Sequence, residues 1–262
     1  MNRPKKNNEG DMMEKEAGHT FLARLGKTRL RPGGKEATDW LLAHGHFTKE
    51  TKVLEVACNM GTTMIELVEK YHCQVTGIDL DQKVIAKAQK NIEKHGLTDK
   101  ITAKRGNAFK LPFEAETFDV VINEAMLTMF PYASKQKAIK EYYRVLKPGG
   151  ILLTHDVRLI KDDPQLVTQL GQTINVHATP LTKENWEELF SQQGFEVTSK
   201  VGPMSLMSPA GMIRDEGFLG TLKIVKNGLK KENRAQFKAM HHLFSSNKDN
   251  FNYIAVASVK PK

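Results

Sequence analysis

The stretch VLEVACNMG, residues 53–61, decides the fold of this chain. Its first five residues are mostly apolar and include two β-branched valines, so they predict a short buried strand that ends in a turn. A helix at 61–71, a second strand at 74–80 (QVTGIDL) and a second helix at 81–95 are expected to follow. Strands that alternate with helices of this length predict a mainly parallel sheet with helices on both faces.

Further apolar runs extend this pattern toward the C-terminus. Five more strands are expected at 101–107, 118–125, 151–157, 195–201 and 251–259, with helices at 133–146 and 182–193. Residues 147–150, Lys-Pro-Gly-Gly, are expected to end the first of these helices. The interval 203–250 predicts two more helices, near 211–229 and 232–245. The sequence therefore predicts an α/β protein with a doubly wound, mainly parallel seven-stranded sheet and a helical insertion before the last strand.

The length of 262 residues fits one α/β domain with additions. Residues 1–20 contain little apolar content, and we expect them to form a mobile tail. Residues 21–262 are expected to form one domain. Within it we expect an N-terminal cover segment at 21–47, a cofactor-binding core at 51–157 and a helical lid at 203–250.

Charge is unevenly distributed along the chain. The net charge is +9, and residues 200–262 alone carry eleven Lys or Arg against four Asp or Glu. Such a basic lobe fits either a solvated surface or a docking site for an anionic partner. The two cysteines, Cys58 and Cys73, lack the spacing of a metal site, so we expect no metal and reduced thiols in the cytoplasm. No apolar run reaches the length of a membrane span.

Ligands of a doubly wound sheet lie beyond the carboxyl ends of its strands, so these ends hold the candidate binding residues. After the first strand, Ala57, Asn59 and Gly61 are small or tolerate left-handed backbone, which lets a ligand approach the main chain closely. The second strand ends in Asp79, 18 residues after Gly61, near the offset at which a carboxylate meets a nucleotide ribose.

A nicotinamide dinucleotide is the obvious competing ligand. Its G-x-G-x-x-G fingerprint would place glycines at 57, 59 and 62, where this chain has Ala, Asn and Thr. Glu55 lies at the strand end, where it would repel a pyrophosphate. A cofactor with a sulfonium and an ammonium, and without phosphate, suits this carboxylate better.

Four segments in order, VLEVACNMGT, VTGIDLD, RGNAFKLPFEAETFDVVINEAML and RVLKPGGILL, resemble the class I S-adenosylmethionine-dependent methyltransferases of the ubiquinone/menaquinone type. They cover about 100 residues, from Val53 to Ile151. The resemblance implies a Rossmann-like fold, S-adenosylmethionine as the cofactor and a set of cofactor-binding residues. These are Gly33, Glu55, Ala57, Cys58, Asn59, Gly61, Asp79, Leu80, Asn107, Ala108 and Asn123.

Methyl transfer needs a general base only if the acceptor carries a proton. Three residues at strand ends are candidates: Glu124, His155 and Asp156. Enzymes that methylate the exocyclic amines of bases typically carry a [DNS]-P-P-[YFW] turn after the fourth strand. The turn after 118–123 has no proline, which argues against that class. Methylation of cytosine C5 needs a nucleophilic cysteine, and neither cysteine is suitably placed.

The remaining classes of acceptor are small molecules, ribose hydroxyls and protein side chains. A small-molecule acceptor is favoured, and the insertion 203–250, which is rich in methionine, would cap its pocket. Two alternatives stay open. One is an RNA- or protein-directed methyltransferase that docks through the basic C-terminal lobe, and the other is a non-catalytic S-adenosylmethionine-binding protein.

Overall fold

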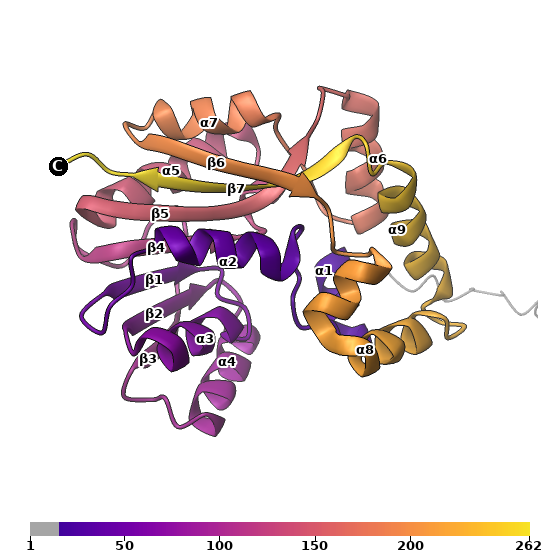
Figure 1. The fold of residues 1–262 in the computed structure, drawn as a ribbon, viewed down its shortest axis with the longest axis horizontal. Coiled ribbons are helices and arrows are strands. Elements are labelled where there is room, and N and C mark those ends of the chain that lie inside the picture. Colours follow the sequence, from indigo (N-terminus) through magenta and orange to yellow (C-terminus); the bar gives the residue numbers. More distant parts are fainter. Residues whose placement is uncertain (1–15) are drawn as a thin grey trace, which may run out of the picture.

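Seven strands form one sheet in the order β3-β2-β1-β4-β5-β7-β6 (Figure 1). Their bounds are Lys52–Val56 (β1), Gln74–Asp79 (β2), Ile101–Arg105 (β3), Phe118–Glu124 (β4), Leu146–Leu159 (β5), Glu196–Pro203 (β6) and Phe251–Val259 (β7). β7 is antiparallel to both of its neighbours, and the other neighbouring strands are parallel. The computed structural model, which describes residues 16–262, therefore confirms the predicted fold.

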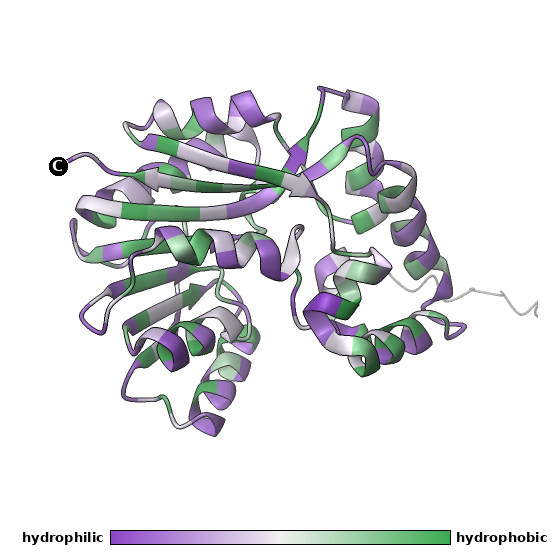
Figure 2. Ribbon diagram, in the orientation of Figure 1, coloured by the Kyte–Doolittle hydropathy of each residue, from purple (hydrophilic) through white to green (hydrophobic). Residues whose placement is uncertain are grey.

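Helices cover both faces of this sheet. α2 (Gly34–His44), α3 (Thr62–Tyr71) and α4 (Gln82–Lys94) enclose one apolar core, and α5 (Tyr132–Val145) and α7 (Lys183–Ser191) enclose the other. In Figure 2 the central strands β4 and β5 carry hydrophobic segments, whereas β6 at the edge of the sheet and the helices mix hydrophobic and hydrophilic residues. Burial on both faces explains the nearly continuous apolar sequence of the central strands.

A separate helical body lies beside the carboxyl ends of the parallel strands (Figure 1). It consists of α1 (Gly18–Leu25), α8 (Pro209–Gly228), α9 (Arg234–Ser246) and α6 (Pro164–Ile174). α1, α8 and α9 share one apolar cluster, in which Met207, Met212 and Met240 are buried. α6 joins α9 through a second cluster that includes Leu166 and Leu243. The insertion therefore packs on the N-terminal helix.

The structure corrects the boundary of the N-terminal tail. Residues 1–15, where most of the expected tail falls, lie outside the described residues, but Gly18–Leu25 is a helix. Phe21, Leu22 and Leu25 of this helix are at most 1% exposed. Packing against α8 and α9 stabilises a helix this short, which its own sequence would not form in water.

Three further details differ from the prediction. β5 begins at Leu146, because the Lys-Pro-Gly-Gly segment continues the strand through a register shift. α8 contains a break at Gly217, whose φ of +72° is not helical. α6 was not predicted, although Asp163 caps its Leu166 amide and Pro164 follows the cap, a readable start signal.

The described residues contain two free and buried cysteines, Cys58 and Cys73. Within the same range, no helix has the length and apolar character that crossing a membrane requires.

An η1 3-10 turn (Leu127–Met129) follows β4 and separates it from α5. The loop after β1 is the connection at which the candidate site begins.

Candidate active site

The turn after β1 is formed by the small or turn-compatible residues that the sequence singled out. Ala57, Asn59 and Gly61 all lie in the left-handed region, with φ of +60°, +47° and +79°. The Cys58 amide donates to Ile78 O at 3.0 Å, which joins the turn to β2. The Cys58 side chain is 2% exposed, and burial raises the pKa of its thiol. Cys58 can therefore offer a ligand its backbone but not a reactive thiolate.

Asp79 lies at the end of β2 and organises the same turn. Its carboxylate accepts from the Asn59 amide at 3.2 Å and from the Asp81 amide at 3.0 Å. Leu80, next to it, is 63% exposed, which is unusual for a leucine and leaves an apolar surface at the strand end. These residues form an open edge suited to a sugar and a flat ring.

Asn107 and Ala108 follow β3, the strand beside β2. Asn107 is exposed, and its Oδ1 accepts from the Phe109 amide at 2.9 Å, so the side chain shapes its own turn. Ala108 is half-buried. Both residues therefore share the edge of the sheet with Asp79.

Glu55 is a buried carboxylate whose hydrogen-bonding capacity is only partly satisfied. The residue is 5% exposed, and its Oε2 has no hydrogen-bond partner among residues 16–262. Burial raises its pKa to about 8, an effect that the nearby Arg31 guanidinium partly offsets. An unpaired buried acceptor beside a ligand-binding turn fits the ammonium of S-adenosylmethionine, so the residues present suit this cofactor.

Asn123 braces the ends of β4 and β1. It is fully buried, and its Nδ2 donates to Val56 O at 3.1 Å. Its Oδ1 is a second buried acceptor for which the structure shows no partner in the described chain. The Asn123 side chain thus binds the last residue of β1, directly before the turn.

Glu124 and His155 are register partners on β4 and β5, so their side chains share one face. His155 Nδ1 lies 3.1 Å from Glu124 Oε2, and the Gly33 amide donates to His155 Nε2 at 2.9 Å. A nitrogen that accepts from an amide carries no proton, so this contact places the ring hydrogen on Nδ1, from which it can donate to Glu124. Burial would raise the pKa of Glu124, but Arg31, His155 and Thr38 together lower it to about 2.

Asp156 does not join these two residues. It follows His155 in the strand, so its side chain points to the opposite face. There it accepts from the Thr128 amide at 3.1 Å and from its neighbour Val157 at 3.0 Å. Burial raises the pKa of Asp156 and lowers that of Lys135, on the same side, to about 8. Asp156 therefore supports the η1 turn, away from Glu124.

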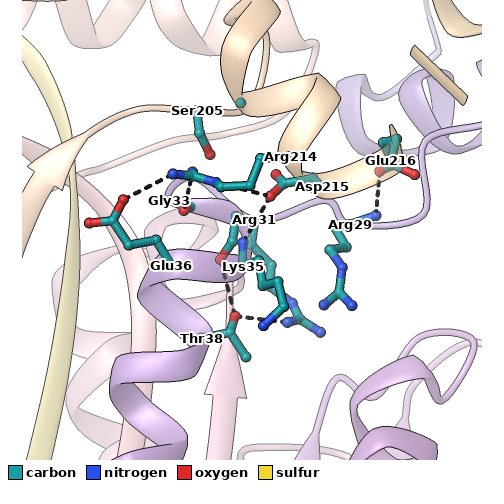
Figure 3. A network of polar contacts seen from close by, with 12 residues as sticks. Arg29, Arg31, Gly33, Lys35, Glu36, Thr38, Ser205, Arg214, Asp215 and Glu216 are labelled. Atoms are coloured by element: carbon teal, nitrogen blue, oxygen red, sulfur yellow. Dashed lines mark hydrogen bonds and ion pairs between the residues drawn. The ribbon is translucent and has the colours of Figure 1, made fainter. Parts of the chain in front are cut away.

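Arg31 is a site residue that the sequence did not reveal. It belongs to residues 27–36, which we call the N-terminal strap. Its guanidinium donates to Thr38 Oγ1 at 2.8 Å (Figure 3). It also donates to Thr63 Oγ1, and its Nε lies 3.4 Å from Glu124 Oε2. Nothing in the local pattern marks this arginine, because its partners lie on α2, α3 and β4.

Comparisons with known proteins agree with this geometry. A family model described as a methyltransferase domain matches residues 53–150. An uncharacterized protein of Haemophilus influenzae is 57% identical over 251 residues, which cover 95% of this chain and 100% of the relative. The demethylmenaquinone methyltransferase of Lactiplantibacillus plantarum is 27% identical over 179 residues, which cover 68% of this chain and 74% of the relative.

The fold also matches solved methyltransferase structures. A phosphoethanolamine N-methyltransferase of Haemonchus contortus superposes with a TM-score of 0.72 at 20% identity, covering 96% of this chain and 59% of the other. That protein was solved with S-adenosylhomocysteine, the product form of the cofactor. Residues 53–150 therefore form a methyltransferase domain, and this chain is an S-adenosylmethionine-dependent methyltransferase.

Proposed function

We propose that this methyltransferase acts on a small molecule, bound where the ends of β4 and β5 meet the N-terminal strap. The observation that carries the proposal is enclosure. The side chains of Glu124 and His155 are 5% and 0% exposed where Arg31 and Gly33 of the strap contact them, and the Arg31 side chain is itself only 10% exposed. A nucleotide within RNA or a side chain on a protein would have to reach under the strap, whereas a small molecule can be surrounded.

The cofactor-binding roles follow from the site. Asp79 would accept from the ribose hydroxyls, and the exposed Leu80 would contact adenine. Glu55 would bind the ammonium group of the cofactor's methionine part. The guanidinium of Arg31, which lies nearby, would bind the carboxylate of the same methionine part. The bound cofactor supplies an already activated methyl group. The chain therefore has to align donor and acceptor, a contribution worth roughly 7–11 kcal/mol in favourable cases.

Among the three candidate bases, His155 is best placed to accept a proton. Glu124, with a pKa of about 2, is a weak base, and its role is to hold the Nδ1–H of His155. Nε2 keeps the lone pair and faces the strap, where the Gly33 amide now donates to it. An acceptor hydroxyl or amine that replaces this amide could pass its proton to Nε2.

The basic C-terminal lobe gives less support to an RNA-directed enzyme. Lys223 and Lys226 of α8 are exposed, as are Lys230 and Lys231 in the connection that follows it. The site itself carries the carboxylates of Asp79 and Glu124 against one arginine, so it offers no excess of positive charge to a phosphodiester chain. The Lactiplantibacillus relative is named for a quinone, which is a small-molecule acceptor.

The experiment is a screen for S-adenosylhomocysteine release over chemically diverse small molecules, with His155→Gln as the matched inactive control. We expect acceptor-dependent release that this variant lacks. A parallel incubation with labelled cofactor and total RNA or protein tests the alternative. Label that enters a macromolecule while no small molecule is methylated would refute the proposal. Cofactor binding without any turnover would favour a non-catalytic protein.

A further inference from the structure

Two adjacent acids in α8 bind the main chain of the N-terminal strap. Glu216 Oε1 accepts from the amides of Thr28 and Arg29 at 2.9 and 3.0 Å, and Oε2 accepts from Thr28 Oγ1 at 2.8 Å. Asp215 Oδ1 accepts from the Lys35 amide at 3.0 Å. The acids therefore hold the strap near both of its ends (Figure 3).

The attachment is buried and closely packed. The side chain of Asp215 is fully buried, and that of Glu216 is 4% exposed. Gly34 has a φ of +56°, and a Cβ at this position would overlap the Asp215 carboxylate. Lys27 lies 3.5 Å from Glu216 and is itself buried, so its charge needs this carboxylate.

The middle of the strap carries the groups that enter the site. Arg31 contacts Thr63 and Glu124, and the Gly33 amide binds His155. These residues lie between the two points at which α8 holds the strap. The position of Arg31 thus depends on acids about 185 positions later in the sequence.

We propose that the Asp215–Glu216 pair of α8 is a positioning element for the site, which holds the strap so that Arg31 and Gly33 reach Glu124 and His155. The inference rests on the proposed function of Arg31 as a cofactor ligand. The sequence predicted that the insertion 203–250 caps the acceptor pocket. The present inference adds that the insertion also affects the affinity for the cofactor.

The sharpest test is Gly34→Ala, with Gly96→Ala as its matched control. Both glycines have positive φ, +56° and +67°, so both substitutions introduce similar backbone strain. Only the first displaces Asp215, since a Cβ at position 96 has no atom within 4 Å. Calorimetry with S-adenosylhomocysteine should show affinity reduced about tenfold or more for Gly34→Ala, the scale of one lost charged hydrogen bond. The control should stay within about twofold.

Hydrogen exchange of the backbone amides supplies a second readout, because strap amides donate to the two acids. Exchange at residues 28–35 should accelerate in Gly34→Ala and remain unchanged in Gly96→Ala. If Gly34→Ala fails to fold, the double variant Lys27→Met/Glu216→Ala replaces it, with Lys27→Met as the control. The double variant removes both members of the buried ion pair, whereas the control keeps the Glu216 carboxylate with its hydrogen bonds to the strap.

The result that overturns the proposal is a faster-exchanging strap with unchanged affinity for S-adenosylhomocysteine. The proposal is also wrong if amide exchange at residues 28–35 is unchanged both in Gly34→Ala and in Lys27→Met/Glu216→Ala. Failure of the proposed function looks different, because the unmodified protein would then release no S-adenosylhomocysteine with any small molecule while these binding differences persist.

Discussion

The two ends of the site are built in different ways. The ribose end, with Asp79, Leu80 and Asn107, is open, and short-range hydrogen bonds within and beside the turns shape it. The transfer end, with Glu124 and His155, is closed, and its contacts join residues 31 to 122 positions apart. One end is a product of local turns, and the other exists only when distant segments dock.

This difference has a thermodynamic consequence. A preformed edge binds its ligand without ordering new chain, whereas a docked strap can open and close as a unit. Substitutions at the ribose end should therefore change affinity directly. Substitutions at the transfer end should also change pH dependence and local dynamics.

The largest expected effect is that of Gly61→Val at the local end. Valine at a φ of +79° is strained, and its side chain would enter the space of Met64, whose Cε lies 3.0 Å from an added Cβ. We expect affinity for S-adenosylhomocysteine to fall by about 100-fold or more, measured by calorimetry. A folded variant with normal affinity would show that the turn after β1 is not the cofactor site.

Asp79→Ala should have the next largest effect. Loss of hydrogen bonds to a charged group should weaken cofactor binding by about 1.5–3 kcal/mol, roughly 10- to 150-fold. Asp81→Ala is the matched control, since Asp81 caps α4 through the Lys83 amide. It should lower the free energy of unfolding by about 1 kcal/mol and leave affinity unchanged. Equal affinities for both variants would contradict the assignment of the ribose to Asp79.

Glu55 should make cofactor binding depend on pH. With a pKa of about 8, the carboxyl is mostly protonated at neutral pH, and an ammonium ligand favours its ionised form. Binding should release up to one proton, so affinity should rise with pH by at most about tenfold per unit between about pH 5.5 and 7.5. Glu55→Gln should abolish this slope. Calorimetry in buffers of different ionisation enthalpy would detect the proton, and no proton release would argue against ammonium binding at Glu55.

The same carboxyl has a predictable effect on stability. Its pKa is raised from 4.5 in the unfolded chain to about 8 in the fold, so the folded state binds more protons. Its stabilising contribution is complete below pH 4.5 and is lost as pH rises through 8. The free energy of unfolding of Glu55→Gln, relative to the unmodified protein, should therefore increase over this window. Urea titrations of both proteins at several pH values would measure this difference in the free energy of unfolding. A difference that does not change with pH would contradict the raised pKa of the Glu55 carboxyl.

The smallest expected effect is a gain of stability at Ala57. Its φ of +60° is unfavourable for alanine, so Ala57→Gly should stabilise the fold by about 1 kcal/mol. Ala86→Gly, the same change on the exposed face of α4, should destabilise it by about 0.5–1 kcal/mol. Urea titrations that gave the same sign for both changes would contradict the strain assigned to the turn.

Much of the molecule could be predicted from residues close together in the chain. The strand VLEVA and the place of Asp79 at the end of β2 follow from short patterns and are found in the structure, whereas the left-handed φ of Ala57 did not follow from its residue type. α6 carried a readable Asp163-Pro164 start signal. α1 carried none, since its helix depends on burial of Phe21 against α8 and α9.

By itself, the sequence determined the seven-stranded α/β sheet, the cofactor turn and the methyltransferase family. Hydrophobic periodicity and turn chemistry act over a few residues, so they can be read along the chain. Only the tertiary structure decided that the Gly33 amide meets His155, that Arg31 enters the site and that Glu216 holds the strap. These contacts depend on how segments far apart in sequence pack, and no local pattern encodes which distant carboxylate an arginine will meet.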